Sequence, residues 1–346
     1  MTDAQTASIW ETSGADRLYE VLPDAWDFGA GMPQTDVVLK TLSGEAVLER
    51  VWEAFASGGG GAIDLLGRLG GLLVMCAVFK QYRASRRDGD NDLLAHCMML
   101  VFALIGFEAL AGLFADAASY FGQIHAAVTA ALTTLTALSV MRGAVQSAAA
   151  AATGMALFLA AAETVCSGVL FPFLRVCTGL SLASAVGAGE APAQLSGLLR
   201  KQFLWLVGGL MTLLCAVLSY QTVLARASDS VTMRAVRFTL SGAVPIIGGA
   251  VGEAASTVAA GFSLAGKTVG ILGIAAILWQ ILPTLLSVYL TRLVFAVSAS
   301  IARMLDMKGE EGVLGECASI AGFLLAVLAA AAVLYILMLT LCMNGG

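Results

Sequence analysis

Charged residues are scarce in this sequence. Asp, Glu, Lys and Arg make up 12% of its 346 residues, whereas a soluble globular domain averages about 25%. Hydrophobic residues make up 59%, and the mean hydropathy is +0.86. A water-soluble fold cannot hide so much apolar surface, which argues against a soluble enzyme. The basic residues also form no stripe of the kind that nucleic-acid binding needs, so we expect no nucleic-acid partner.

Patterns for metals, disulfides and catalysis are also missing. The seven cysteines form no CxxC pair and mostly fall inside apolar runs, so we expect neither a disulfide framework nor a zinc site. His96 and His125 lie near the ends of different predicted spans, with no cluster of ligands around them. No GxSxG or HExxH motif occurs. We therefore predict no catalytic, metal-binding or cofactor-binding residues, and we do not expect an enzyme.

Long apolar stretches are what the sequence does contain. A membrane-spanning helix needs about 20 mostly apolar residues. The stretches are continuous and do not alternate, which disfavours a β-barrel. We predict an all-α, polytopic helical membrane protein with about eight spans. The candidate spans are Ala62–Tyr82, Leu93–Ala117, Phe121–Met141, Ser147–Val165, Cys166–Gly187, Gln202–Ala225, Val269–Phe295 and Cys317–Cys342.

Composition divides the chain into four regions. Residues 1–61 hold ten acidic and three basic residues, and this acidic tail is expected outside the cytoplasm. Its start shows no signal-peptide pattern. Residues 62–225 carry the first six predicted membrane helices, and residues 268–346 carry the last two and the C-terminus. The run Gly58–Gly61 is expected to act as a flexible joint before the first span.

The fourth region, residues 226–267, has the most unusual pattern. It begins with a polar helical pattern and continues into an apolar stretch interrupted by Pro245, Gly248 and Gly249. This stretch is too short and too broken to span, and such a backbone is tolerated only at the interface or where protein buries it. We predict an amphipathic or re-entrant segment, with a helix on each side of the break, at the outer membrane surface.

Basic residues set the expected orientation. Lys80, Arg83, Arg86 and Arg87 form the densest basic group, and they follow the first span directly. We assign this group to the cytoplasm. Basic residues within 226–267 then fall outside, in conflict with the rule. Alternating the spans places the following basic residues inside as well: Arg142, Arg200, Lys201, Arg303 and Lys308.

Charged residues within predicted spans are the usual markers of an ion or substrate path. Asp64 and Arg68 are spaced to pair on one helix face. Glu108 lies about 22 Å into the second span, either as a partnered structural carboxylate or as the lining of a polar path. Arg175 and Arg292 are its candidate partners by depth. The complete set is Asp64, Arg68, Glu108, Asp116, Glu163, Arg175 and Arg292.

Residues Gly261–Thr268 fit the phosphate-binding pattern GxxxxGK[ST]. That loop requires a strand before it and a helix after it in a soluble α/β fold. The preceding residues have a helical pattern and the following helix is a predicted span, so we expect no nucleotide binding. Small residues four apart would permit close helix contacts. These pairs are Gly67/Gly71, Gly248/Gly252 and Gly266/Gly270.

A series of short elements lies within Ser219–Gly273. They are Tyr220-Gln221, Asp229, Arg237-Phe238, Pro245 with Gly248, Ser263 with Lys267, and Val269-Gly270. This series resembles the stage III sporulation protein AE family, over about residues 137–341 and only weakly over residues 1–60. Arg237 stands where relatives have Lys.

The resemblance implies a multi-pass protein of the mother-cell membrane that faces the forespore. With other membrane proteins of the same sporulation complex, it would help build a channel-like assembly across both membranes. The resemblance supplies no catalytic residue. A stand-alone secondary transporter or permease is the alternative, but it calls for breaks at matching positions of two halves, and Pro172 is the nearest counterpart of Pro245. A membrane ATPase would rest on Gly261–Thr268 alone.

Overall fold

The computed structural model describes residues 44–85, 92–141, 145–184, 191–206 except 193, part of 208–227, and 248–345. These residues are almost entirely helical and include no strand, which confirms the all-α prediction for this part of the chain. Four described helices are long and apolar enough to cross a membrane. The candidate spans are Leu48–Tyr82, His96–Met141, Lys267–Met304 and Lys308–Thr340.

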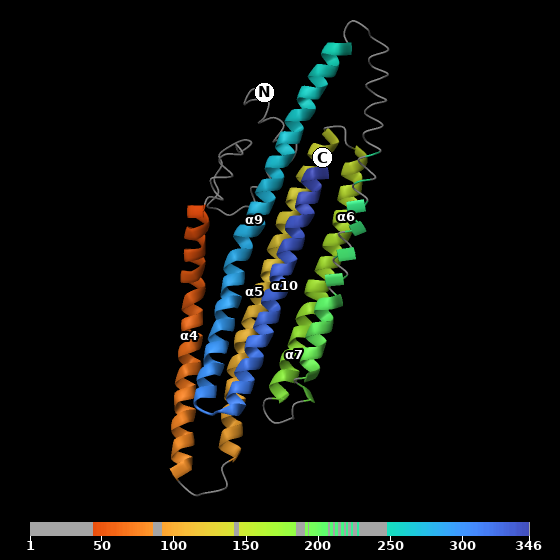
Figure 1. Ribbon diagram of the computed structural model, residues 1–346. Coiled ribbons are helices and arrows are strands. Elements are labelled where there is room, and N and C mark those ends of the chain that lie inside the picture. The colour runs from red at the N-terminus through yellow and green to blue at the C-terminus, as the bar shows by residue number, and fades with distance from the viewer. Residues whose placement is uncertain are drawn as a thin grey trace.

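The four long helices run side by side along one axis and alternate in direction (Figure 1). The helix α9 lies at the centre and packs against α10, α4 and α5. A shorter group of helices packs against α5 and α10. The long helices are α4 (Gly44–Ser85), α5 (Asp92–Met141), α9 (Gly248–Met304) and α10 (Lys308–Gly345). The shorter ones are α6 (Val145–Glu163), the π-helix η1 (Thr164–Leu170) and α7 (Phe171–Ala183).

Helix α5 corrects the predicted span pattern. Leu93–Ala117 and Phe121–Met141 were expected to be two spans, but they form one helix of 50 residues. The residues between them include neither Gly nor Pro, so nothing interrupts the helical hydrogen bonding. Tyr120 is instead buried with its ring 5.5 Å from that of Phe121. His96 and His125 consequently lie on the same helix, not on different ones.

The continuity of α5 also changes the expected orientation. Met141, which precedes Arg142, lies at the opposite end of the bundle from Lys80. The end of α5 at Met141 therefore does not lie on the side of Lys80, where the eight-span alternation put this part of the chain; Arg142 itself lies outside the described residues. Arg303 does lie at the Lys80 end, since Lys80 Nζ donates to the carbonyl oxygen of Leu305 at 3.1 Å.

The glycine run Gly58–Gly61 is not a joint. It lies within α4, which is continuous from Gly44 to Ser85. Helix α9 packs directly against the first of these glycines: a Cβ added at Gly58 would lie 3.7 Å from the Cα of Ser287 and 3.9 Å from a methyl of Leu290. Contact with α9 offsets the low helix propensity of glycine.

Helix α9 likewise runs across the expected boundary between residues 226–267 and 268–346. The helix predicted after the break and the seventh span are one helix of 57 residues, with Pro283 inside it. Pro245 and the rest of the predicted break before Gly248 lie outside the described residues. The amphipathic or re-entrant character of that part stays a prediction.

Eight spans are not what the described residues show. The fourth and fifth predicted spans correspond to the shorter apolar helices Ala148–Ala161 and Gly168–Ala183. The π-helix η1 separates α6 from α7, and Pro172 stands in the first turn of α7. The structure describes only part of the sixth predicted span, Gln202–Ala225. The first, seventh and eighth spans correspond to α4, α9 and α10.

The long helices exceed the thickness of a bilayer. The apolar part of α5, His96–Met141, has 46 residues and is about 69 Å long, whereas the hydrocarbon core is about 30 Å thick. Large apolar side chains are exposed toward both of its ends, with Leu104 at 69% and Val140 at 46%. One bilayer therefore cannot cover the whole apolar length of this bundle.

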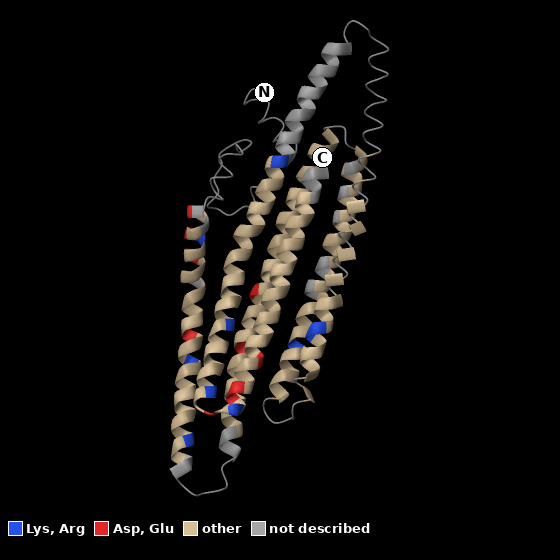
Figure 2. Cartoon of the chain, in the orientation of Figure 1, with Lys and Arg blue, Asp and Glu red and all other residues tan. Residues whose placement is uncertain are grey.

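Charged side chains gather mainly in the half of the bundle that ends at the α9–α10 turn (Figure 2). In this turn Asp306 has φ 55°, the left-handed conformation that ends many helices and that Asp tolerates. Lys80 Nζ lies 3.2 Å from the Asp306 carboxylate, which fastens α4 to the turn. The opposite half is apolar, with Leu272, Ile277 and Leu339 fully buried.

Candidate functional site

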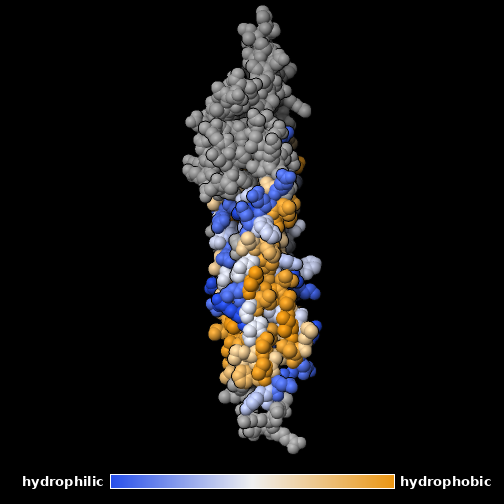
Figure 3. All heavy atoms as spheres, turned by 90° about the vertical axis from the view of Figure 1, so that its left-hand side faces the viewer, coloured by the Kyte–Doolittle hydropathy of each residue, from blue (hydrophilic) through white to orange (hydrophobic). Residues whose placement is uncertain are grey.

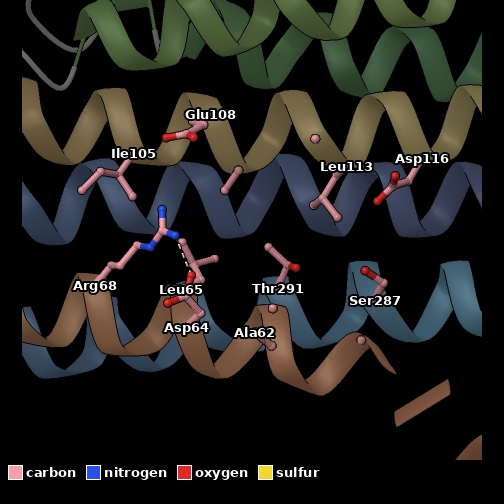
Figure 4. A pocket seen from close by; sticks show the side chains of 14 residues that line it. Ala62, Asp64, Leu65, Arg68, Ile105, Glu108, Leu113, Asp116, Ser287 and Thr291 are labelled. Atoms are coloured by element: carbon pink, nitrogen blue, oxygen red, sulfur yellow. Dashed lines mark ion pairs between the residues drawn. The ribbon is translucent and has the colours of Figure 1, made fainter. Parts of the chain in front are cut away.

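A cleft with charged walls lies between α4 and α5. Both helices pack extensively on α9 but make little contact with each other, so a space of about 300 Å³ opens between them. Helix α4 forms one wall, α5 the other, and α9 the floor (Figure 4). The polar lining residues are Asp64, Arg68, Glu108, Asp116, Ser287 and Thr291.

The α4 wall carries an ion pair near the middle of its span. Arg68 Nη2 lies 2.7 Å from Asp64 Oδ2, which confirms the predicted i,i+4 pair. Glu53 and Lys80 flank it at about 16 Å and about 18 Å along the helix. The pair therefore lies near the centre of the apolar part of α4. The two side chains are nevertheless 62% and 59% exposed, so the rest of this chain covers less than half of either.

The α5 wall carries two carboxylates. Glu108 and Asp116 are eight residues apart, or about 12 Å along the helix, and both face the cleft. The hydroxyl-bearing residues Ser287 and Thr291 of α9 lie at the floor. Figure 4 shows Arg68 reaching from α4 into the space between the walls. The structure thus favours the polar-path interpretation of Glu108 over that of a carboxylate buried with a structural partner.

The prediction of Arg175 and Arg292 as partners of Glu108 is wrong. Arg175 on α7 and Arg292 on α9 do not line the cleft. The guanidinium of Arg292 instead lies against α10, where a Cβ added at Gly322 would be 3.0 Å from its Nε. The basic residue that shares the cleft with Glu108 is Arg68. Of the predicted charged residues, four come together, and the side chain of Glu163 lies outside what the structure describes.

The charge balance of the cleft is negative. Three carboxylates face one guanidinium, and placing an ionised group at the centre of a bilayer costs about 2.5–3.5 kcal/mol on insertion scales. The cleft therefore favours water, a cation or a basic side chain over lipid. Within the described residues, no three His, Cys, Asp or Glu side chains are close enough together to hold a metal ion. Chemically, the cleft is suited to the passage of water or a cation, or to the docking of a basic side chain.

A second charged site escaped the sequence analysis. Arg200, in the helical stretch 194–206, is 7% exposed and donates to Glu316 Oε2 and Ser319 Oγ on α10, both at 2.9 Å. This arrangement fastens the stretch to α10. The sequence pattern had used Arg200 only as one of the basic residues that set the expected membrane orientation. More than 110 residues separate it from its partners in the sequence, so no local spacing could have identified the pair.

The segment Gly261–Thr268 lies within α9. Helical hydrogen bonding engages its backbone N–H groups, whereas a phosphate-binding loop must direct several of them at the ligand. The described residues include no strand before this segment. The backbone conformation required by the motif is therefore not the one the segment adopts.

A family model for stage III sporulation protein AE matches residues 39–346. A curated relative from Bacillus subtilis (strain 168), named stage III sporulation protein AE, is 23% identical over 218 residues, which are 62% of this chain and 54% of the relative. The chain thus spans about half the length of that relative. No solved structure matches it. Because the family model covers most of its length, this chain belongs to the stage III sporulation protein AE family.

Proposed function

We propose that this chain is a non-enzymatic membrane subunit of a channel-like sporulation complex that links the mother cell and the forespore. Family membership supports a role in sporulation, and four long apolar helices support a place in a membrane. In this proposal the chain lies in the mother-cell membrane, and its partners are the lipid and other membrane proteins of the complex. It needs no cofactor and no nucleotide.

The observation that carries the proposal is the charged cleft between α4 and α5. Ionisable groups within a membrane bundle persist where they pair, contact water or face another protein. Asp64, Arg68, Glu108 and Asp116 line a cleft that is open at the side of the bundle. The apolar surface also extends beyond the thickness of one bilayer. Both features are expected of a subunit that neighbouring chains complete.

Glu108 provides the test. We expect Glu108→Gln to keep most of the spore yield and complex assembly, because an amide can still form hydrogen bonds in the cleft. Glu108→Leu should reduce both, because leucine puts an apolar side chain into the polar wall of the cleft. Phe107→Leu, at the adjacent exposed position, is the matched control and should behave like wild type. Wild-type yield and assembly for Glu108→Leu, at equal protein levels, would contradict the proposal.

The interrupted helix α6–η1–α7 favours one alternative, a stand-alone secondary transporter. Transporters place broken helices at their substrate sites, and here the π-helix Thr164–Leu170 is followed by Pro172. Purification of the full chain from sporulating cells separates the two functions. Stable recovery of other membrane proteins supports the subunit. Recovery of the chain alone, with solute uptake by proteoliposomes that contain it, supports the transporter.

A further inference from the structure

The exposed face of α5 has an unusual composition between Phe107 and Val140. Every large apolar side chain of α5 between these two residues is buried. The exposed positions there carry only small or polar side chains. Figure 3 views the bundle from the α4 side and shows hydrophilic surface interrupting the hydrophobic surface. In a chain with 59% hydrophobic residues, such a face is poorly suited to contact lipid.

The polar residues of this face form one stripe that starts in the cleft. Small residues occupy the positions between them, and the steps of three or four residues keep the stripe on one side of the helix. From Glu108 to Thr133 the stripe is about 37 Å long, which exceeds the hydrocarbon core of about 30 Å. Its polar members, all exposed, are Glu108, Asp116, Ser119, Gln123 and Thr133.

Helix α9 provides further polar groups at the floor of the cleft. Gln280, Thr284, Ser287 and Thr291 share one face of α9 and are half-buried. Ser298 lies two turns beyond Thr291 on that face and is fully buried, and its hydroxyl oxygen has no hydrogen-bond partner among the described residues. A buried hydroxyl is normally hydrogen-bonded, by water where no protein group is in reach. This face of α9 therefore favours water over about 27 Å.

The exposed face of α10 at the same depth is apolar. Gly273 of α9 packs between Ala131 of α5 and Leu339 of α10, which places the upper part of the α5 stripe level with this face. Val333 is 60% exposed and Leu337 is 45% exposed. At one depth, the bundle thus presents a face suited to lipid on α10 and a face suited to water on α5.

We propose that the α5 stripe and the polar face of α9 line a water-filled path that carries cations across the membrane beside α4. The inference rests on the proposed channel function and names the class of solute. Asp64 and Arg68 neutralise each other at 2.7 Å, so the carboxylates of Glu108 and Asp116 leave the path negative. Fixed negative charge along a pore raises the local concentration of cations and excludes anions.

Charged, water-soluble thiol reagents test the path in isolated membranes of sporulating cells, which contain the full chain with its partners. Gln123→Cys and Ala126→Cys on α5 are compared with Ala330→Cys and Val333→Cys on α10, each in a chain whose seven cysteines are replaced by alanine. The α5 thiols should react at least about tenfold faster, because a thiol forms the reactive thiolate in water and not in lipid. Equally slow reaction on both helices would mean that lipid or a partner covers the stripe, and would overturn the proposal. Two positions on each helix keep the result independent of one unstable variant.

A cationic and an anionic methanethiosulfonate test the sign of the charge, with each rate divided by that of a free thiol in solution. At Gln123→Cys the cationic reagent should react about tenfold faster. Glu108→Gln with Asp116→Asn should remove this preference and leave the thiol accessible. No preference, or a preference for the anion, in the chain that keeps both carboxylates would overturn the proposal. Recovery of partner proteins with the chain is measured separately, so loss of the subunit function and loss of the path are distinguishable.

Discussion

Glycines in α9 and in α4 have opposite surroundings. Where α9 meets α5 and α10, a Cβ added at Gly273 would lie 3.2 Å from a Leu339 methyl and 3.3 Å from the Ala131 Cβ. On α4, a Cβ added at Gly67 or Gly70 would meet nothing within 4 Å. The first glycine is required by packing, whereas the others leave surface open. Abundance of glycine therefore says little about its role until the neighbouring helices are placed.

The charged pair at α10 and the charged pair on α4 also differ in how far they are covered. The side chains of Arg200 and Glu316 are 8% and 29% exposed, and their pair is enclosed between α10 and the helical stretch 194–206. Those of Asp64 and Arg68 are 62% and 59% exposed at the cleft. An enclosed pair holds elements of one chain together. An open pair in a membrane helix is available to water, ligand or another chain.

The largest expected effect on stability is where α9 packs against α5 and α10. Gly273→Leu should destabilise the bundle by about 2–3 kcal/mol, because its side chain has no space between α9, α5 and α10. Thermal unfolding in detergent measures the change, and Gly67→Leu serves as the control on α4. Equal unfolding temperatures for the two variants would show that packing does not require glycine at position 273 more than at position 67.

Loss of the enclosed pair should be nearly as costly. Arg200→Ala leaves the carboxylate of Glu316 and the hydroxyl of Ser319 without this donor, and we expect a loss of about 1–3 kcal/mol. The adjacent exposed residue provides the control, Lys201→Ala, which should change stability little. A wild-type unfolding temperature for Arg200→Ala would show that the pair does not hold the 194–206 stretch to α10.

A smaller effect is expected where α5 meets α10. A Cβ added at Gly106 would lie 2.7 Å from Cys317 Sγ, so Gly106→Ala should cost about 1 kcal/mol. Removal of the sulfur should restore space, and Cys317→Ala should be less harmful when Gly106→Ala is present. A double-mutant cycle on unfolding free energies measures this coupling. Strictly additive losses would argue against the contact.

The smallest expected effect has the opposite sign. Gly70→Ala in α4 adds a methyl group that meets nothing within 4 Å, and alanine favours a helix over glycine by about 0.5–1 kcal/mol. We expect a slight rise in the unfolding temperature, or none if the membrane already enforces the helix. A clear loss of stability would mean that this part of α4 is covered. The contrast between the open glycines of α4 and the packed Gly273 of α9 would then be smaller.

Local pattern was sufficient for several correct predictions. Apolar length predicted an all-helical chain with long apolar helices at the positions of α4, α9 and α10. The i,i+4 spacing predicted the Asp64–Arg68 pair, because both residues lie on one helix and need no information from elsewhere. The elements within 219–273 indicated the family that the comparison then confirmed.

Other predictions failed where the outcome depended on distant contacts. Gly58–Gly61 have the composition of a joint, yet all four stay helical, and α9 packs against the first of them, Gly58. Leu93–Ala117 and Phe121–Met141 were predicted as two spans, but neither Gly nor Pro stands between them and α5 continues. Depth along a helix suggested Arg292 as the partner of Glu108, whereas the packing turns Arg292 toward α10.

The sequence by itself determined that this chain is helical, apolar and a member of its sporulation family, since composition, period and motif are properties of neighbouring residues. The tertiary structure alone decided which charges share a site. Asp64 and Arg68 on α4 come to the same cleft as Glu108 and Asp116 on α5 because both helices pack on α9 and leave a space between them. Helix periodicity specifies the face of each residue, but only packing specifies what that face meets.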